Sequence, residues 1–301
     1  MSIVLVKGLG ISFGNVQALA EIELDIPKGL IYGIIGPDSA GKTTLLRSIC
    51  TLLPFKEGKI EVMGMDALKQ AASIRAQIGY MPQRFSLYKD LSVEQNLQFS
   101  ARLFGVKSKE LVQSSERLYR FSRLKPFAKR LAGNLSGGMQ QKLALSCALI
   151  HKPRLIVLDE PTFGVDPVSR MDFWKILHTL KEEGISIVVS TPYMDEAEQC
   201  DLISLLFKGR VIGKGTPVEI LSGWQGRLYR LSSDSPQTLY HFLKNDMKMT
   251  DLQLFGSEIH LSAVSQITDD TFAKWQKLCP ELKAWQQIDP NMEDVFLKMM
   301  K

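Results

Sequence analysis

Long hydrophobic runs are missing from this sequence. No apolar run among its 301 residues approaches the roughly 18 residues that a membrane-spanning helix needs. Residues 1–7 have the composition of a first β-strand rather than of a signal peptide. We therefore expect a soluble chain, in which any membrane-spanning part of the system belongs to a separate polypeptide.

Cysteine is scarce and widely spaced. The four cysteines are Cys50, Cys147, Cys200 and Cys279. They form no Cys-x-x-Cys pair and have no metal-ligand spacing, which excludes a disulfide framework and a zinc site built on cysteine. We expect them to be small buried residues in a reducing compartment.

Neither sign of charge dominates. The chain carries 37 basic and 32 acidic residues, and its net charge of +5 is spread along the sequence. A solvated basic face explains so small an excess, and we expect no nucleic-acid partner. The length allows one large domain plus a small one, or two domains.

A glycine-rich loop at residues 36–44 is the most informative feature present. It follows the apolar run 30–35, precedes the helix-like segment 45–49, and fits G-x-x-x-x-G-K-[ST] in the strand–loop–helix context that this motif requires. Glycines let successive N–H groups converge on phosphate oxygens, while Lys42 reaches the terminal phosphates and Thr43 can bind Mg²⁺. The alternative is a chance glycine-rich turn. The residues expected to contact a nucleoside triphosphate here are Gly36, Pro37, Asp38, Ser39, Ala40, Gly41, Lys42, Thr43 and Thr44.

Two carboxylates follow a second apolar run. Residues 155–158 are typical of a strand buried on both faces of a parallel sheet, and Asp159 and Glu160 come directly after them. We predict that Asp159 helps to hold Mg²⁺ and that Glu160 orients or deprotonates the attacking water. Solvated loop acids are the alternative, but the phosphate loop favours hydrolytic chemistry.

A third segment offers another anion site. Ser136, Gly137 and Gly138 precede a helical pattern, and the N–H groups at such a helix start can bind phosphate. The simpler interpretation is that Ser136 caps an ordinary helix.

Taken together, these motifs resemble the nucleotide-binding subunit of an ABC transporter. Residues 36–44, 135–140 and 155–160 match the Walker A, signature and Walker B motifs, and the order and spacing hold over roughly residues 1–220. The resemblance further identifies Phe13 as the aromatic that stacks on adenine, Gln83 as the Q-loop residue and Asp166 as the D-loop residue. It implies that Gln83 serves both Mg²⁺ and catalysis, and that two such subunits sandwich two ATP molecules, each signature facing the partner's Walker A loop.

The sequence departs from the family pattern at a few positions. Asp38, Ser39 and Met139 replace more usual residues without removing a backbone donor. Pro192 stands where the family's switch histidine would fall, and proline cannot donate a hydrogen bond to a γ-phosphate. None of His151, His178, His241 and His260 lies in that loop. Pro192 is therefore either a tolerated turn residue or the cause of weakened hydrolysis.

The expected fold is α/β, of the P-loop NTPase class and the ABC-ATPase type. We predict an ATPase domain over residues 1–215 and a small α+β accessory domain over 216–301. Within the first, residues 1–30 predict an antiparallel β subdomain, 30–88 and 153–215 a RecA-like parallel sheet with helices, and 89–150 an inserted helical subdomain. The resemblance places residues 85–88 against a membrane subunit; the alternative is a hydrophobic loop packed on its own domain.

The resemblance implies an ATP-binding and hydrolysing subunit of a multisubunit exporter at the cytoplasmic face of the inner membrane. Residues 291–297 are similar to the tail of type-2 drug and polysaccharide exporter ATPases. The expected cofactors are ATP and Mg²⁺, and the expected partners are a transmembrane permease and a second ATPase subunit, identical or different. The alternatives are a degenerate ATP sensor with weak turnover and a non-transport ABC ATPase.

Overall fold

The computed structural model describes residues 1–83, 87–264 and 266–300. The chain forms two compact units, one of Met1–Pro217 with the chain end from Met299, the other of Val218–Lys298. Independent domains with a boundary after residue 215 stay a prediction. Phe85 and Ser86, part of the segment expected to contact a membrane subunit, lie outside the described residues.

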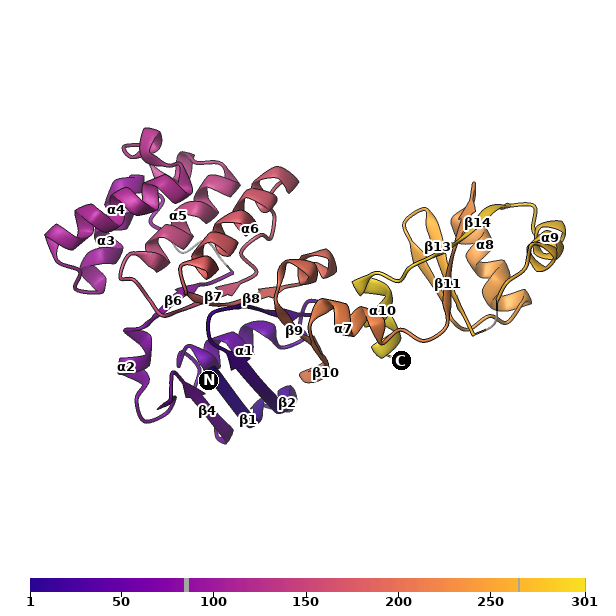
Figure 1. The fold of residues 1–301 in the computed structure, drawn as a ribbon, viewed down its shortest axis with the longest axis horizontal. Helices are drawn as coiled ribbons and strands as arrows, with labels where there is room; N and C mark the ends of the chain where they lie inside the picture. Colours follow the sequence, from indigo (N-terminus) through magenta and orange to yellow (C-terminus); the bar gives the residue numbers. More distant parts are fainter. Residues whose placement is uncertain (84–86, 265, 301) are drawn as a thin grey trace. The chain divides into compact units, whose positions relative to one another are not determined.

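A six-stranded sheet forms the centre of the first unit (Figure 1). Its order is β10-β9-β3-β8-β7-β6, and all neighbours are parallel except the β9–β10 hairpin. The strands are β3 (Ile31–Ile35), β6 (Ile78–Met81), β7 (Leu155–Asp159), β8 (Ser186–Thr191), β9 (Leu202–Phe207) and β10 (Arg210–Gly215). Every residue of β3, β7 and β8 is buried, as continuous apolar runs predict. The carboxyl ends of β3 and β7 therefore lie at the same edge, separated only by β8.

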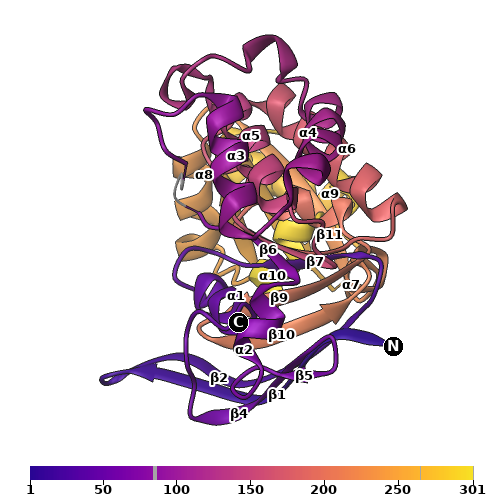
Figure 2. The same ribbon diagram turned by 90° about the vertical axis from the view of Figure 1, so that its left-hand side faces the viewer.

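An antiparallel sheet of order β2-β1-β4-β5 forms a second layer (Figure 2). It consists of β1 (Ser2–Phe13), β2 (Val16–Pro27), β4 (Glu57–Val62) and β5 (Met65–Asp66). The antiparallel strands expected within residues 1–30 are confirmed. The assignment of residues 57–66 to the parallel core is wrong, because β4 pairs antiparallel with β1 and then turns directly into β5. The expected parallel arrangement also fails at β10, which forms a hairpin with β9.

Some helices of the first unit pack on the central sheet, and others pack mainly on one another. They are α1 (Lys42–Ile49), α2 (Ala71–Arg75), α3 (Val93–Leu103), α4 (Ser108–Ser122), α5 (Gly137–Leu149) and α6 (Pro167–Glu182). Helices α3, α4 and α5 pack together in the region predicted to be helical, and α5 also packs on α6 (Figure 1). Within the described ranges, none of the helices combines the length and apolar character needed to cross a bilayer. All four cysteines are buried, as expected.

The second unit has a four-stranded antiparallel sheet of order β12-β13-β11-β14. Its strands are β11 (Arg227–Ser233), β12 (Leu252–Phe255), β13 (Glu258–Ala263) and β14 (Leu282–Ile288). The helices are α7 (Pro217–Ser222), α8 (Pro236–His241), α9 (Asp269–Leu278) and α10 (Met292–Met299), with a π-helical turn at Phe242–Asp246. Sequence patterns predict a strand at 227–232, a hairpin of 251–255 with 258–261, and helices at 236–243, 271–278 and 292–299, but not α7, the π-helical turn or β14. The last is an edge strand with mostly solvent-facing polar residues, so its alternation is weak.

Candidate nucleotide-binding site

The phosphate loop connects β3 to α1. Gly41, just before α1, has φ 106°, a left-handed conformation that favours glycine. A Cβ on Gly36 would lie 2.2 Å from the backbone oxygen of Leu206, so a side chain does not fit there. Both glycines of the motif are therefore required by the backbone path, which leaves the loop and the start of α1 facing the cavity.

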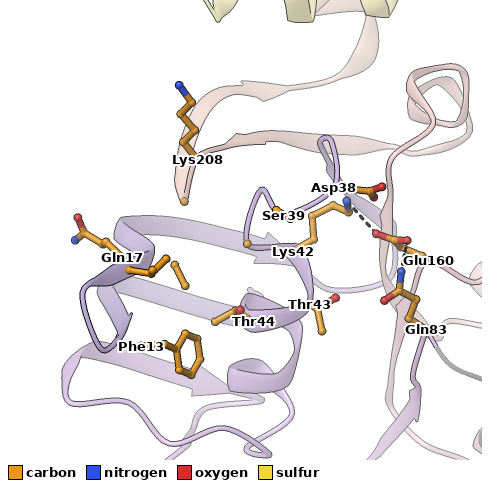
Figure 3. A pocket seen from close by; sticks show the side chains of 14 residues that line it. Phe13, Gln17, Asp38, Ser39, Lys42, Thr43, Thr44, Gln83, Glu160 and Lys208 are labelled. Carbon is orange, nitrogen blue, oxygen red and sulfur yellow. Dashed lines mark hydrogen bonds and ion pairs between the residues drawn. The ribbon is translucent and has the colours of Figure 1, made fainter.

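Lys42 is the first residue of α1, and its side chain is folded back over the loop. Its Nζ donates to the backbone oxygens of Gly36 at 2.8 Å and Pro37 at 2.9 Å. It also forms an ion pair with Glu160 Oε1 at 2.9 Å, and the two side chains are only 3% and 4% exposed (Figure 3). Because a buried ammonium requires a partner, Glu160 provides here the negative charge that a phosphate would bring.

Asp159 ends β7 and lies beside the start of α1. Its Oδ1 accepts hydrogen bonds from Thr43 Oγ1 at 3.1 Å and Ser190 Oγ at 2.8 Å. Its Oδ2 is buried and has no hydrogen-bond partner in the described part of the chain. Burial raises the pKa of this carboxyl, against the lowering effect of the Ser190 and Thr43 hydroxyls. A partnerless carboxylate oxygen beside a threonine hydroxyl suits Mg²⁺, which prefers hard oxygen ligands.

Glu160 is held from two sides. Gln83 Nε2 donates to Glu160 Oε2 at 2.7 Å, while Lys42 binds the other carboxylate oxygen (Figure 3). The backbone N–H of Glu160 donates to the side-chain and backbone oxygens of Ser190 at 3.1 Å each. Glu160 itself has a left-handed φ of 48°. These contacts fix the carboxylate at the mouth of the phosphate loop.

A cavity of about 590 Å³ brings most of the predicted residues together (Figure 3). Its lining includes the predicted residues Phe13, Asp38, Ser39, Gly41, Lys42, Thr43, Thr44, Gln83 and Glu160. Gly36, Pro37 and Ala40 belong to the same loop without lining the cavity, and Asp159 lies behind Thr43. Phe13, at the end of β1, is 52% exposed and therefore available for stacking.

Some residues that line the cavity are not predicted from the sequence. Val16, Gln17 and Ala18 come from the start of β2, and Lys208 and Gly209 from the turn between β9 and β10. A Lys-Gly pair in a hairpin turn carries no signal that separates it from an ordinary turn. The serine at 190 was also missed. Its role depends on β8 lying beside β7, which the sequence alone does not give.

The signature residues lie outside this cavity. Ser136 caps α5, since its Oγ accepts the backbone N–H of Met139 at 3.4 Å. Ser136 and Gly137 are exposed, whereas Gly138 is buried against Ser169. Asp166 similarly caps α6 by accepting the Ser169 N–H at 2.9 Å, which lowers the pKa of Asp166. Both caps leave an exposed helix start on the surface.

Pro192 follows β8 directly. The next residue, Tyr193, donates its N–H to Thr191 Oγ1 at 3.1 Å. Among the residues that the structure describes, none of the four histidines lines the cavity. The position of the expected switch residue therefore carries no side-chain donor.

Arg170 of α6 anchors the segment after Pro192. Its guanidinium forms an ion pair with Asp195, approaches Glu196 Oε1 at 3.2 Å and lies 4.7 Å from the centre of the Tyr193 ring. Glu196 Oε1 also accepts from Thr162 Oγ1 at 2.8 Å and from Trp174 Nε1 at 3.0 Å. Because Thr162 lies two residues after Glu160, this buried carboxylate joins the two loops that follow β7 and β8.

Comparison with known proteins identifies the family. The family model described as ABC transporter matches residues 19–163. Daunorubicin resistance ATP-binding protein DrrA3 from Streptomyces coeruleorubidus is 36% identical over 306 residues, covering 98% of this chain and 92% of that protein. The chain belongs to the ABC transporter ATP-binding proteins. The resemblance inferred from the motifs is thereby confirmed.

Other relatives agree. The probable multidrug ABC transporter ATP-binding protein YbhF of Escherichia coli (strain K12) is 36% identical over 304 residues, which are 99% of this chain and 52% of YbhF. The chain thus spans about half the length of that relative.

Solved structures confirm the α/β ABC-ATPase fold. A structure titled as the ATP binding subunit of an ABC transporter has a TM-score of 0.67 and 28% identity, covering 73% of this chain and 92% of that one. The dimeric ATP-binding cassette MJ0796 bound to ADP and Pi has a TM-score of 0.64 and 26% identity, covering 71% and 98%.

Proposed function

We propose that this chain binds and hydrolyses ATP as a subunit of a multisubunit ABC exporter. ATP-driven closure of two such subunits would be coupled to transport through a separate membrane protein. The observation that carries the proposal is that Lys42, Thr43, Asp159, Glu160 and Gln83 come from three separate segments and meet in or directly beside one cavity. The names of the daunorubicin resistance and multidrug transporter relatives favour export over a non-transport ATPase.

Binding begins with an exchange of partners. When the triphosphate enters, the Lys42 ammonium leaves Glu160 Oε1 for the phosphate oxygens, and the loop N–H groups donate to the same oxygens. Thr43 and Asp159 would hold Mg²⁺, with Gln83 beside them, and the bound metal would supply positive charge against the phosphates. Freed from Lys42, the Glu160 carboxylate accepts a hydrogen bond from the attacking water and orients it.

A second ATPase subunit, identical or different, completes the site. Ser136 and Gly137 are exposed and lie outside their own cavity, so their N–H groups are available to phosphates bound on another subunit. ATP then favours the closed dimer because it binds across both subunits. We place the complex at the cytoplasmic face of the inner membrane, where ATP is available.

Pro192 weakens turnover at this chain's own Walker site. The phosphate loop, the carboxylates and Gln83 are all in place, but the switch position lacks a donor for the γ-phosphate. The missing donor should lower the rate of ATP hydrolysis more than the affinity for ATP. If the second ATPase subunit is a different protein, the two ATP sites of the dimer would differ. Ser136–Gly138 of this chain would then complete a hydrolytically competent site on the phosphate loop of that partner.

An ATPase and binding assay on the purified chain tests the proposal. Wild type should bind ATP and hydrolyse it slowly, Glu160→Gln should bind without turnover, and Lys42→Ala should not bind. Binding with no turnover in wild type, alone or in its complex, would instead favour an ATP sensor, the alternative that Pro192 supports. No ATP binding at all would refute both.

A further inference from the structure

A second cavity lies among the helices of the first unit. It has a volume of about 210 Å³ and shares no lining residue with the nucleotide cavity. Its walls come from the end of α4 and the residue after it, from α5, and from the middle of α6. The lining residues are Arg120, Phe121, Arg123, Lys142, Asp172, Lys175, Ile176 and Thr179.

The lining is strongly basic. Four cationic side chains face a single carboxylate, Asp172, which lies 3.3 Å from Lys142 Nζ and 3.7 Å from Lys175 Nζ. One carboxylate is therefore shared by two lysines. Within the described residues, no carboxylate lies within ion-pair distance of Arg120 or Arg123.

The ends and faces of α4, α5 and α6 bring these basic side chains to the same cavity. Arg123 follows α4 in a left-handed conformation (φ 56°), which ends the helix there. Lys142 is only 15% exposed and approaches from α5. The hydrogen bond from Lys142 and the charges of Lys142, Lys175 and Arg123 lower the pKa of Asp172, so all three cations act on this one carboxyl. Phe121 and Ile176 supply an apolar part of the wall.

The volume of the cavity limits the size of the ligand that it can hold. At about 30 Å³ for each water molecule, 210 Å³ corresponds to roughly seven waters. That is room for one or two phosphate groups, whereas the nucleotide cavity is nearly three times larger. The planar fork of a guanidinium matches phosphate oxygens in pairs, and two arginines lack an acidic partner here.

We propose that this cavity binds a phosphate-bearing anion, with Arg120 and Arg123 as the main ligands and Lys142 and Lys175 in support. The phosphate is that of a small soluble molecule or of an anionic lipid headgroup. A bound anion would join α4, α5 and α6. Helices α5 and α6 begin beside Ser136 and Asp166, so the site would brace both exposed helix starts.

Calorimetric titration of the full chain with pyrophosphate tests the site. Wild type should show saturable binding that Arg120→Gln/Arg123→Gln weakens at least about tenfold, as the loss of two paired donors implies. Lys109→Gln/Lys129→Gln removes the same charge at exposed positions outside the cavity and should bind like wild type. All three proteins share an unaltered nucleotide cavity, so binding there cancels and the outcome is independent of the proposed function. Equal affinity in all three, or equal weakening in both variants, would overturn the proposal.

Sedimentation with lipid vesicles distinguishes a lipid headgroup from a small soluble molecule as the source of the phosphate. If the phosphate is a lipid headgroup, wild type should sediment with phosphatidic acid vesicles but not with neutral phosphatidylcholine vesicles, and the double arginine variant should remain in solution. Pyrophosphate binding without vesicle binding assigns a soluble ligand. Vesicle binding that both charge variants reduce equally is diffuse attraction and counts against the site.

Discussion

Asp159 and Glu160 are adjacent buried carboxylates with opposite surroundings. Glu160 is fully engaged by Lys42 and Gln83, whereas Asp159 keeps one oxygen without a hydrogen-bond partner. A buried carboxylate oxygen without a hydrogen-bond partner costs free energy, and a cation bound to that oxygen would offset the cost. Neighbouring residues of one chemical type thus acquire different roles from their contacts.

Asp159→Asn should stabilise the ligand-free protein while removing Mg²⁺-dependent turnover. Burial raises the pKa of Asp159 above its ordinary 3.8, so the ionised form costs stability at pH values above the raised pKa. That cost fades as the pH falls through the raised pKa. Thermal unfolding should therefore show the variant's advantage at neutral pH and its loss in acid.

Glu160→Gln is the matched control for that experiment. Its carboxylate is paired with the Lys42 ammonium, so the substitution leaves a buried cation without its counter-ion and should destabilise the protein. A stabilised Glu160→Gln, or an Asp159→Asn without any advantage at neutral pH, would contradict this account of the two carboxylates.

Phe13→Ala should weaken ATP and GTP binding by similar amounts. Phe13 lines the cavity and is 52% exposed, so it can stack on any purine while contributing little to the core. Stacking of a base on an aromatic side chain is worth about 1 to 3 kcal/mol. Fluorescence titration with both nucleotides measures the loss. Unchanged affinity for both would mean that Phe13 serves local packing.

Pro192→His should raise kcat with little change in KM. A donor aimed at charge that develops in the transition state contributes about a hundredfold to a thousandfold in rate, and the proline supplies none. Steady-state ATPase assays on the purified complex compare the two proteins. Brisk wild-type hydrolysis with no gain in the variant would show that Pro192 is a neutral turn residue.

At the scale of elements, the sequence predicted what is local and missed what depends on pairing. The β3–loop–α1 unit follows from glycine spacing between an apolar run and a helix, and β7 with Asp159 and Glu160 follows from continuous hydrophobicity. The wrong sheet for β4, and the overlooked wall at Lys208, arise because partners in a sheet are distant in sequence. No local pattern records which strand lies next to which.

The segment after β8 provides a further test at this scale, through Arg170. Glu196 is 2% exposed and Asp195 is 69% exposed, although both pair with Arg170. Arg170→Gln should cost about 3 kcal/mol of unfolding free energy, because it leaves a buried carboxylate without its cation. Asp195→Asn should cost about 0.5 kcal/mol or less, as exposed ion pairs do. Urea unfolding measures both losses of unfolding free energy. Equal losses would show that burial of the carboxylate does not determine the cost of breaking its ion pair.

At the scale of the whole molecule, the two predicted phosphate-binding segments lie apart. The cavity is lined by the phosphate loop, Glu160 and Phe13, whereas Ser136 and Gly137, which are predicted to bind phosphate, are exposed elsewhere on the same unit. Motif spacing predicts both groups of residues. It could not show that a single chain keeps them apart, since that depends on how α5 is placed relative to β3 and β7.

The last prediction follows from this separation. Glu160→Gln should accumulate as an ATP-bound dimer in analytical ultracentrifugation with ATP and Mg²⁺, because ATP closes two subunits that cannot then hydrolyse it. Gly137→Glu in the same background should keep the chain monomeric yet still bind ATP. Gly137 is exposed and a Cβ there meets nothing within 4 Å, so the fold tolerates the change, while the added carboxylate repels phosphate on the partner. If Glu160→Gln stays monomeric alone, mixing with the candidate partner ATPase distinguishes a heterodimer from a failed assignment. A Gly137→Glu chain that still dimerises would place the contact elsewhere.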